Sequence, residues 1–191
     1  MNAKRLPISL LLVVTLLFLS GCGSRQVQDS LAGSSAQRLV TQAIDELVTQ
    51  LPDDDFSPLR GQRLWLDSHF FAANDLQRYA DHRLRVELAR RWAIEPADSR
   101  DQADAILTVF YTSLGTDQGH LGFSLPLGVI PGVDDAMRIN LITLEQFHGI
   151  AELYYYLGPS GTELRGPRLQ SRQRNDALGL PIITIPLSTV D

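Results

Sequence analysis

The histidines are the residues with the widest scope for chemistry, and one of the four has an acidic neighbour at a useful spacing. Asp67 lies two residues before His69, so on a strand its carboxylate would share a face with the imidazole and could orient it as a general base. His82, His120 and His148 are scattered, and none of the four belongs to an H-x-x-x-H or H-E-x-x-H motif. The spacing predicts no metal site and no catalytic residues, with a hydrolase using His69 and Asp67 as the alternative.

Phosphate-binding and acyl-transfer motifs are also missing from the sequence. It contains no G-x-S-x-G, no G-x-G-x-x-G and no Walker loop. Lys4 is the only lysine, and it lies at the extreme N-terminus. We therefore expect no cofactor.

Cys22 is the only cysteine, so its thiol has no disulfide partner within the chain. Lys4 and Arg5 precede an apolar run over residues 6–19, which is shorter than the roughly 20 residues needed to span a bilayer. Small residues follow at positions 20–21, directly before the cysteine. This order of features is typical of a secretory signal peptide that is removed in the mature protein.

The tetrapeptide Leu19-Ser20-Gly21-Cys22 resembles the lipobox of bacterial lipoproteins. The resemblance implies a diacylglyceryl group on the Cys22 sulfur, cleavage before Cys22 and acylation of the new amino group, with palmitate as a typical chain. Two or three acyl chains anchor a protein stably, whereas one does not. Gly23 stands where an aspartate commonly implies retention in the inner membrane, so the resemblance implies an outer-membrane anchor facing the periplasm. The alternative is an ordinary signal peptide with a chance cysteine at the cleavage point.

The signal peptide and the lipobox-like tetrapeptide determine the expected domain organisation. We expect a lipoprotein signal peptide at residues 1–21, a flexible tether at 22–33 and one periplasmic α/β domain at 34–191. The net charge of −5 becomes more negative once the signal with its two basic residues is removed. An acidic chain is a poor match to nucleic acid, so we expect no nucleic-acid partner.

The helices are marked by apolar spacing and by their flanking residues. One is expected from Ser34 or Ser35 to Leu51, ended by Pro52, and a second at 75–92, capped by Asn74. Strands are expected at 62–70, 93–95, 105–113, 139–147 and 150–157, with a hairpin return after the turn at 158–161, an exposed crossing or short helix at 167–178 and a proline-bounded edge strand at 180–186. The fold class is α/β (α+β), a single domain with a mixed sheet of about five to six strands and two main helices on one face.

Part of this order is similar to a known module. The strand, helix and short strand within residues 60–113, ending in "DQADAILTVFY", resemble the periplasmic α/β module of the curli-secretion lipoprotein and of lipoprotein activators of peptidoglycan synthases. The stretch "GSSAQRLVTQAIDEL" also resembles the start of an uncharacterised family of Gram-negative lipoproteins. That family implies no enzymatic activity.

Residues 115–136 differ in composition from the rest of the chain. Large apolar residues alternate with glycine, serine and proline, and the apolar positions are Leu121, Phe123, Leu125, Leu127 and Val129. The glycines and prolines favour an irregular loop folded over the sheet edge, with its apolar side sealing the core. The alternative is an exposed apolar surface that binds a partner or lipid through these five residues.

The function expected from these observations is a membrane-anchored, non-enzymatic binding or assembly module in the cell envelope. Its partners would be the lipid bilayer, through acylated Cys22, and an envelope protein. The alternative is the periplasmic hydrolase based on His69 and Asp67.

Overall fold

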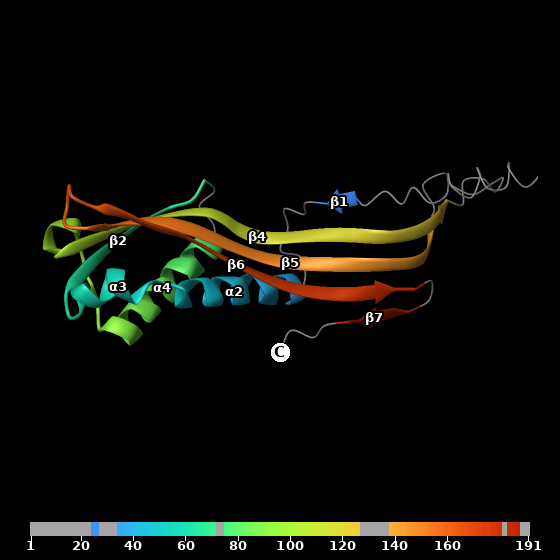
Figure 1. Cartoon of the computed structure of the whole chain (residues 1–191), viewed down its shortest axis with the longest axis horizontal. Helices are drawn as coiled ribbons and strands as arrows, with labels where there is room; N and C mark the ends of the chain where they lie inside the picture. Colours follow the sequence, from blue (N-terminus) through green and yellow to red (C-terminus); the bar gives the residue numbers. More distant parts are fainter. Residues whose placement is uncertain (1–23, 27–33, 72–74, 127–137, 181–182, 188–191) are drawn as a thin grey trace, which may run out of the picture. The chain divides into compact units, whose positions relative to one another are not determined.

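The computed structural model describes residues 24–26, 34–71, 75–126, 138–180 and 183–187 (Figure 1). The signal peptide, Cys22 and Asn74 lie outside these ranges. Contacts divide the chain into two compact units: unit 1 comprises residues 1–26, 118–146 and 176–189, and unit 2 comprises 27–117, 147–175 and 190–191.

The described elements follow one another in a simple order. The helices are α2 (Ser34–Thr49), α3 (Asp53–Phe56), η1 (Ser57–Leu59), α4 (Asp75–Trp92) and η2 (Arg100–Gln102). The strands are β1 (Ser24–Gln26), β2 (Arg63–His69), β3 (Glu95–Pro96), β4 (Ala105–Pro126), β5 (Arg138–Gly158), β6 (Leu164–Gly179) and β7 (Thr184–Pro186). The three longest strands, β4, β5 and β6, contribute residues to both units.

The sheet in unit 2 is mixed, which confirms the predicted fold class. Its strand order is β3-β2-β4-β5-β6, and β2 runs parallel to both β3 and β4. The α4 helix connects β2 to β3, as expected for a parallel pair that needs a helical crossover. β4 and β5 are antiparallel, because Phe110 stacks on Tyr154 while the later Thr112 bonds to the earlier Glu152.

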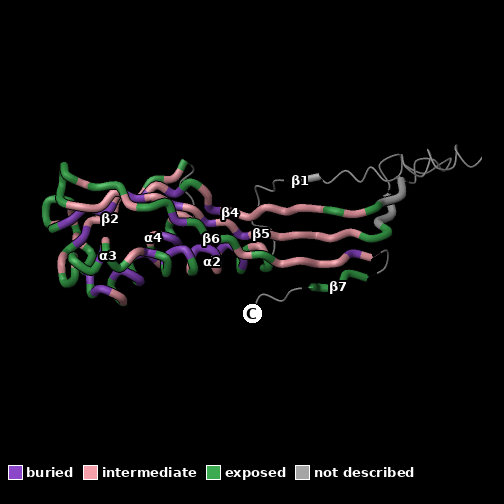
Figure 2. The backbone as a smooth tube through the Cα atoms, in the orientation of Figure 1, coloured by how far each residue is buried: buried purple, intermediate pink, exposed green. Residues whose placement is uncertain are grey.

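The core of unit 2 lies between this sheet and the two long helices (Figure 2). The α2 helix buries one continuous face, which confirms the spacing seen in the sequence: Leu39, Val40, Ala43, Ile44, Leu47 and Val48. Phe56, Trp92 and Tyr155 fill the space at the end of the helices, with Phe56 stacked 5.0 Å from Trp92. Burial of this apolar surface is the main source of stability for unit 2.

Gly149 determines how closely α2 approaches the sheet. A Cβ atom at this position of β5 would lie 2.2 Å from the carbonyl oxygen of Leu39 and 2.8 Å from the backbone nitrogen of Val40. Both obstacles are helix backbone, which cannot rotate away as a side chain can. Glycine is therefore required where the helix lies against this strand.

Unit 1 is an antiparallel sheet with the order β1-β4-β5-β6-β7. β1 pairs with β4 in the register Ser24 to His120, so three residues of the segment expected to form a tether are in a strand. β7 pairs with the end of β6, with Leu178 opposite Ile185, which confirms the predicted edge strand. Every described helix belongs to unit 2.

Several sequence predictions were wrong in extent. Residues 115–126 continue β4 and do not form an irregular loop, and β5 is one strand through His148 and Gly149 where two were predicted. The predicted crossing or short helix at 167–178 is part of β6. The short strand begins at Glu95 because Ala93 adopts a positive φ of 52° and its amide still bonds to the Ala89 carbonyl, which ends α4.

Replacing Gly149 with alanine should destabilise unit 2 by about 3 kcal/mol, because the added methyl group overlaps the α2 backbone. Gly115 on β4 is the matched control, since a Cβ there would meet nothing within 4 Å. We expect Gly115→Ala to change stability by less than about 1 kcal/mol. Urea unfolding followed by circular dichroism measures both, and equal effects of the two substitutions would contradict the close approach of α2.

Candidate functional site

The face of the unit 2 sheet that carries no helix is the first candidate surface. Side chains alternate along a strand, and the positions next to those in the core point away from α2 and α4. This places Asp67, His69, Phe110, Tyr154 and Tyr156 on the open face, while Tyr155 is buried. The three consecutive tyrosines therefore point to both faces of β5, as alternation along a strand requires.

A stacked row of side chains crosses this open face. His69 on β2 stacks on Phe110 on β4 with ring centroids 4.9 Å apart, and Phe110 stacks on Tyr154 on β5 at 5.1 Å. The guanidinium of Arg165 on β6 lies 5.2 Å from the centre of the Tyr154 ring. Because the ring faces are occupied by one another, the row presents mainly ring edges to solvent. Such cross-strand pairs stabilise an exposed sheet face.

The predicted His69 and Asp67 pair does form, with 3.4 Å between Nε2 and Oδ1. Both side chains are about half exposed on the open face. Ser68, the serine between them, points to the helix side and donates its hydroxyl proton to Asp81 Oδ2 over 2.7 Å. The pair is thus an oriented imidazole on a flat surface, and the adjacent serine is not positioned as its nucleophile.

The β6 strand brings arginines to the same face of unit 2. Leu169 and Ser171 are buried against the core, so the even-numbered residues around them point outward. The exposed arginines of this strand are Arg165, Arg168, Arg172 and Arg174. Alternation places the last three on the open face, and Arg165 lies there because its guanidinium is over the Tyr154 ring. Residues 164–175 contain four arginines and no carboxylate, in a chain whose net charge is −5. Among the described residues, neither Arg168 nor Arg172 forms an ion pair.

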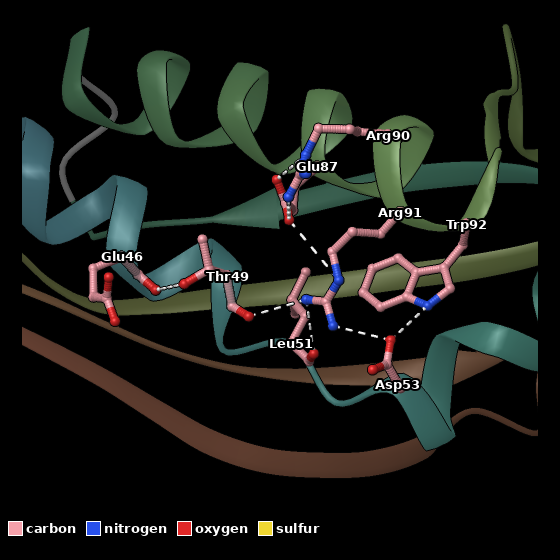
Figure 3. A network of polar contacts seen from close by, with 8 residues as sticks. All are labelled: Glu46, Thr49, Leu51, Asp53, Glu87, Arg90, Arg91 and Trp92. Carbon is pink, nitrogen blue, oxygen red and sulfur yellow. Dashed lines mark hydrogen bonds and ion pairs between the residues drawn. The ribbon is translucent and has the colours of Figure 1, made fainter.

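The arginines of α4 have a different, structural role (Figure 3). Arg91 donates to the carbonyl oxygens of Thr49 and Leu51 at the end of α2, at 3.0 and 3.1 Å, and to Asp53 Oδ1 at 2.9 Å. Trp92 donates its indole proton to the same Asp53 oxygen at 3.0 Å. This network fixes the C-terminal end of α2 against α4, as a basic side chain near exposed carbonyls commonly does.

Acidic side chains in this region have structural roles. Asp53 accepts from Arg91 and Trp92, and Asp55 accepts the Tyr155 hydroxyl proton at 2.5 Å. Glu87 is 2 % exposed on α4. Its carboxylate is neutralised by Arg90, one turn along the same helix, at 2.6 Å. The partners of Asp53 and Asp55 are distant in sequence, and no local signal reveals them.

Tyrosines in unit 2 have raised pKa values. Burial is the main cause of the raised pKa of Tyr155, followed by its hydrogen bond to Asp55. Burial likewise raises the pKa of Tyr111 well above its usual value, with further contributions from the charge of Asp81 and the hydrogen bond to it. Each phenol is held protonated because its phenolate would be desolvated beside a carboxylate.

The second candidate surface is the strand surface of unit 1, which contains the predicted partner-binding residues. Leu121 is 59 % and Phe123 48 % exposed on β4. Leu125 also lies on β4, without a described burial, while Leu127 and Val129 lie outside the described residues. Gly179 is the only residue buried in the part of unit 1 whose burial is described (Figure 2). This sheet therefore has no buried side chain in that part.

The described ranges offer few other candidate sites. No group of three or more histidine, cysteine or acidic side chains there could hold a metal ion. A small pocket beside β3 is lined mainly by core residues such as Leu64, Leu66 and Leu88, with Arg85 and Glu95 also in its wall. None of the described helices combines the length and hydrophobicity needed to cross a membrane.

Comparison with known proteins adds little to this geometry. No protein-family model and no curated protein sequence matches the chain. One solved structure is similar, the LpoB C-terminal domain from Salmonella enterica, at 9 % sequence identity and a TM-score of 0.33. The match covers 70 % of this chain and 97 % of that domain. An identity and a TM-score this low carry no functional information about this chain.

The raised tyrosine pKa values predict a loss of stability in alkali. Below about pH 10 the phenols are protonated in both the folded and the unfolded chain. Above that pH the unfolded chain ionises while folded Tyr155 and Tyr111 hold their protons, so the free energy of unfolding falls. At pH 11 ionisation of the unfolded chain should lower the free energy of unfolding by roughly 1 kcal/mol for each tyrosine.

Urea unfolding between pH 8 and 11 measures this loss. Tyr155→Phe should make the fall above pH 10 shallower, and at neutral pH it should cost about 1 kcal/mol through the lost bond to Asp55. Tyr156→Phe, on the open face, is the matched control and should leave the profile unchanged. A profile insensitive to Tyr155→Phe would show that the phenol ionises equally in both states.

Proposed function

We propose that this chain is a lipid-anchored, non-enzymatic binding or assembly module of the cell envelope. In this proposal Cys22 carries the lipid, the anchor lies in the outer membrane and the described residues face the periplasm. The lipobox-like sequence at residues 19–22 supports the anchor. The two exposed surfaces described above support the binding role.

The observation that carries the proposal is where the exposed apolar side chains lie. Ten large hydrophobic side chains are exposed in the described part of the chain, and seven belong to unit 1. These seven are Leu121, Phe123, Leu141, Ile142, Ile183, Ile185 and Leu187. Contiguous exposed apolar surface is typical of a site that contacts a protein or a membrane. A catalytic role would leave this feature without an explanation.

The arginine row of unit 2, defined as Arg165, Arg168, Arg172 and Arg174, provides a second surface of different chemistry. Arginine forks bind carboxylates in pairs of parallel hydrogen bonds, so an envelope protein with an acidic surface or segment would match this row. Charged side chains on an edge strand also prevent unwanted strand pairing. In the partner role the row also binds an acidic envelope protein. Reversing its charge should weaken that binding, so charge reversal distinguishes the partner role from protection of the edge.

The hydrolase alternative receives less support. His69 and Asp67 are oriented, but they lie on an exposed face and Ser68 points away from them. His69 also stacks on Phe110, which gives the imidazole a packing role.

The anchor is tested by replacing the proposed lipid acceptor. Mass spectrometry of the protein from its native host should show Cys22 as the N-terminal residue with a diacylglyceryl group, and the protein should sediment with membranes. Cys22→Ser should leave the added mass absent and shift most of the processed protein to the soluble fraction, because several acyl chains are lost together. An unmodified Cys22 would contradict the proposal directly.

The arginine row is tested by charge reversal and crosslinking in cells. Arg168→Glu with Arg172→Glu should reduce crosslinks to an acidic envelope protein at least tenfold, since attraction becomes repulsion. Arg38→Glu, at an exposed site on α2, is the matched control and should leave the crosslinks unchanged. If both variants crosslink like the original chain, the row serves only to protect the edge.

A further inference from the structure

The two faces of the unit 1 sheet can be assigned from two close approaches and one strand register. A Cβ on Gly122 of β4 or on Gly179 of β6 would fall within 3 Å of Thr143 of β5, so the Thr143 side chain lies between these two glycines on one face. Because side chains alternate along a strand, the residues next to Gly122, Thr143 and Gly179 in the sequence point to the other face. Leu178 is opposite Ile185 in the β6–β7 register, which extends the same face to β7.

The resulting surface, here called the apolar face of unit 1, is made mainly of large aliphatic and aromatic residues, with Gln146 and Asp176 at its margins. Its members are Leu121, Phe123, Ile142, Leu144, Leu178 and Ile185. The opposite face carries Gly122, Thr143, Gly179 and Thr184, with Leu141 as its large apolar residue. One-sided apolar composition is typical of a sheet that packs on a second layer. The described part of unit 1 contains no such layer.

Three features indicate what covers this face. Residues 118–126 and 177–187 contain no Asp, Glu, Lys or Arg, so transfer of the face to an apolar medium desolvates no formal charge from these segments. Cys22 is two residues before Ser24, the first residue of β1, in the sequence. β1 pairs with β4 at residues 118–120, next to Leu121.

We propose that the apolar face of unit 1 lies on the lipid bilayer, with Leu121, Phe123 and Ile142 among the acyl chains beside the lipid on Cys22. The position of the lipid belongs to the function proposed above, whereas the affinity of the face for a bilayer does not depend on it. The inner strands of the sheet are hydrogen-bonded on both sides, so in a contact through this face the side chains enter the apolar region first. The anchor and the face then act as two membrane-binding signals on one short stretch of chain.

The test uses the processed chain beginning at residue 22 with Cys22→Ser, which contains every described residue and no lipid. The probe is a vesicle of neutral phosphatidylcholine, so the arginine row contributes little attraction. We expect the protein to bind these vesicles in flotation assays, with binding unchanged in 0.5 M salt because the contact is apolar. Leu121→Ser with Phe123→Ser should lower the partition coefficient at least tenfold.

Two controls keep the comparison matched. Leu141→Ser removes an exposed leucine from the opposite face, and Leu164→Ser removes one from unit 2; both should bind vesicles like the parent chain. Circular dichroism checks that each variant is folded. As an independent readout, Phe123→Trp should be quenched by brominated lipid, while Leu164→Trp should not be.

The possible outcomes separate the lipid contact of the apolar face from the Cys22 anchor of the proposed function. Absence of vesicle binding, or equal loss in all serine variants, overturns the lipid contact even if native Cys22 is acylated. A lipid-free dimer that dissociates only in the Leu121→Ser, Phe123→Ser variant also overturns it, because a second copy would then cover the face. Vesicle binding with an unmodified native Cys22 overturns the anchor and leaves the lipid contact standing.

Discussion

The alternation of side chains across β4, β5 and β6 is the constraint on which the rest of the structure depends. In unit 2, one set of alternate residues meets α2 and α4, and Val109, Leu153 and Leu169 are buried there. In unit 1, alternate residues of the same strands form an equally apolar face, but the described residues supply no helix to cover it. A sheet face of this composition requires a second layer, and in our account the bilayer is that layer.

The sequence predicted most of the elements whose signals are local. The α4 helix was predicted at its observed bounds because apolar spacing and a flanking cap agree, and α2 was predicted to within two residues of its end. The stretch after Gly115 was misread because glycine and proline usually interrupt strands. The start of β6 was predicted as the hairpin return after the turn at 158–161, but its continuation through residues 167–178 was missed because its outward positions are arginine and glutamine, and only Leu169 reveals its buried side.

The candidate surfaces were predicted only in part, for a physical reason. Leu121 and Phe123 were named as contact residues because their alternation is visible along the sequence. The arginine row was not recognised, since it appears only when residues 164–175 are known to be an edge strand. Gly149 and the bonds of Asp53 and Asp55 join residues far apart in the chain, and a single sequence does not encode such pairings locally.

The two surfaces differ in the partners that their chemistry suits. Residues 118–126 and 177–187 of unit 1 contain no formal charge that would oppose entry into lipid, and Asp176 lies at the margin of the face, whereas the arginine row of unit 2 would be costly to desolvate unless carboxylates met it. An anchored module with one surface for lipid and another for an acidic protein would bring that protein to the membrane without any chemical step. The stacked row from His69 to Arg165 then stabilises the open sheet face beside the arginines.

The most direct measurement of the central claim is the accessibility of single spin labels along the strands of unit 1 on a bilayer. Labels are placed in turn at positions 120 to 123 and 141 to 144 of the Cys22→Ser chain, and their collision rates with oxygen and with a water-soluble nickel complex are compared. We predict a period of two, with oxygen favoured at 121, 123, 142 and 144 and nickel favoured at the positions between them. Equal accessibility to both reagents along each strand, or a period of two with the opposite phase, would contradict the account.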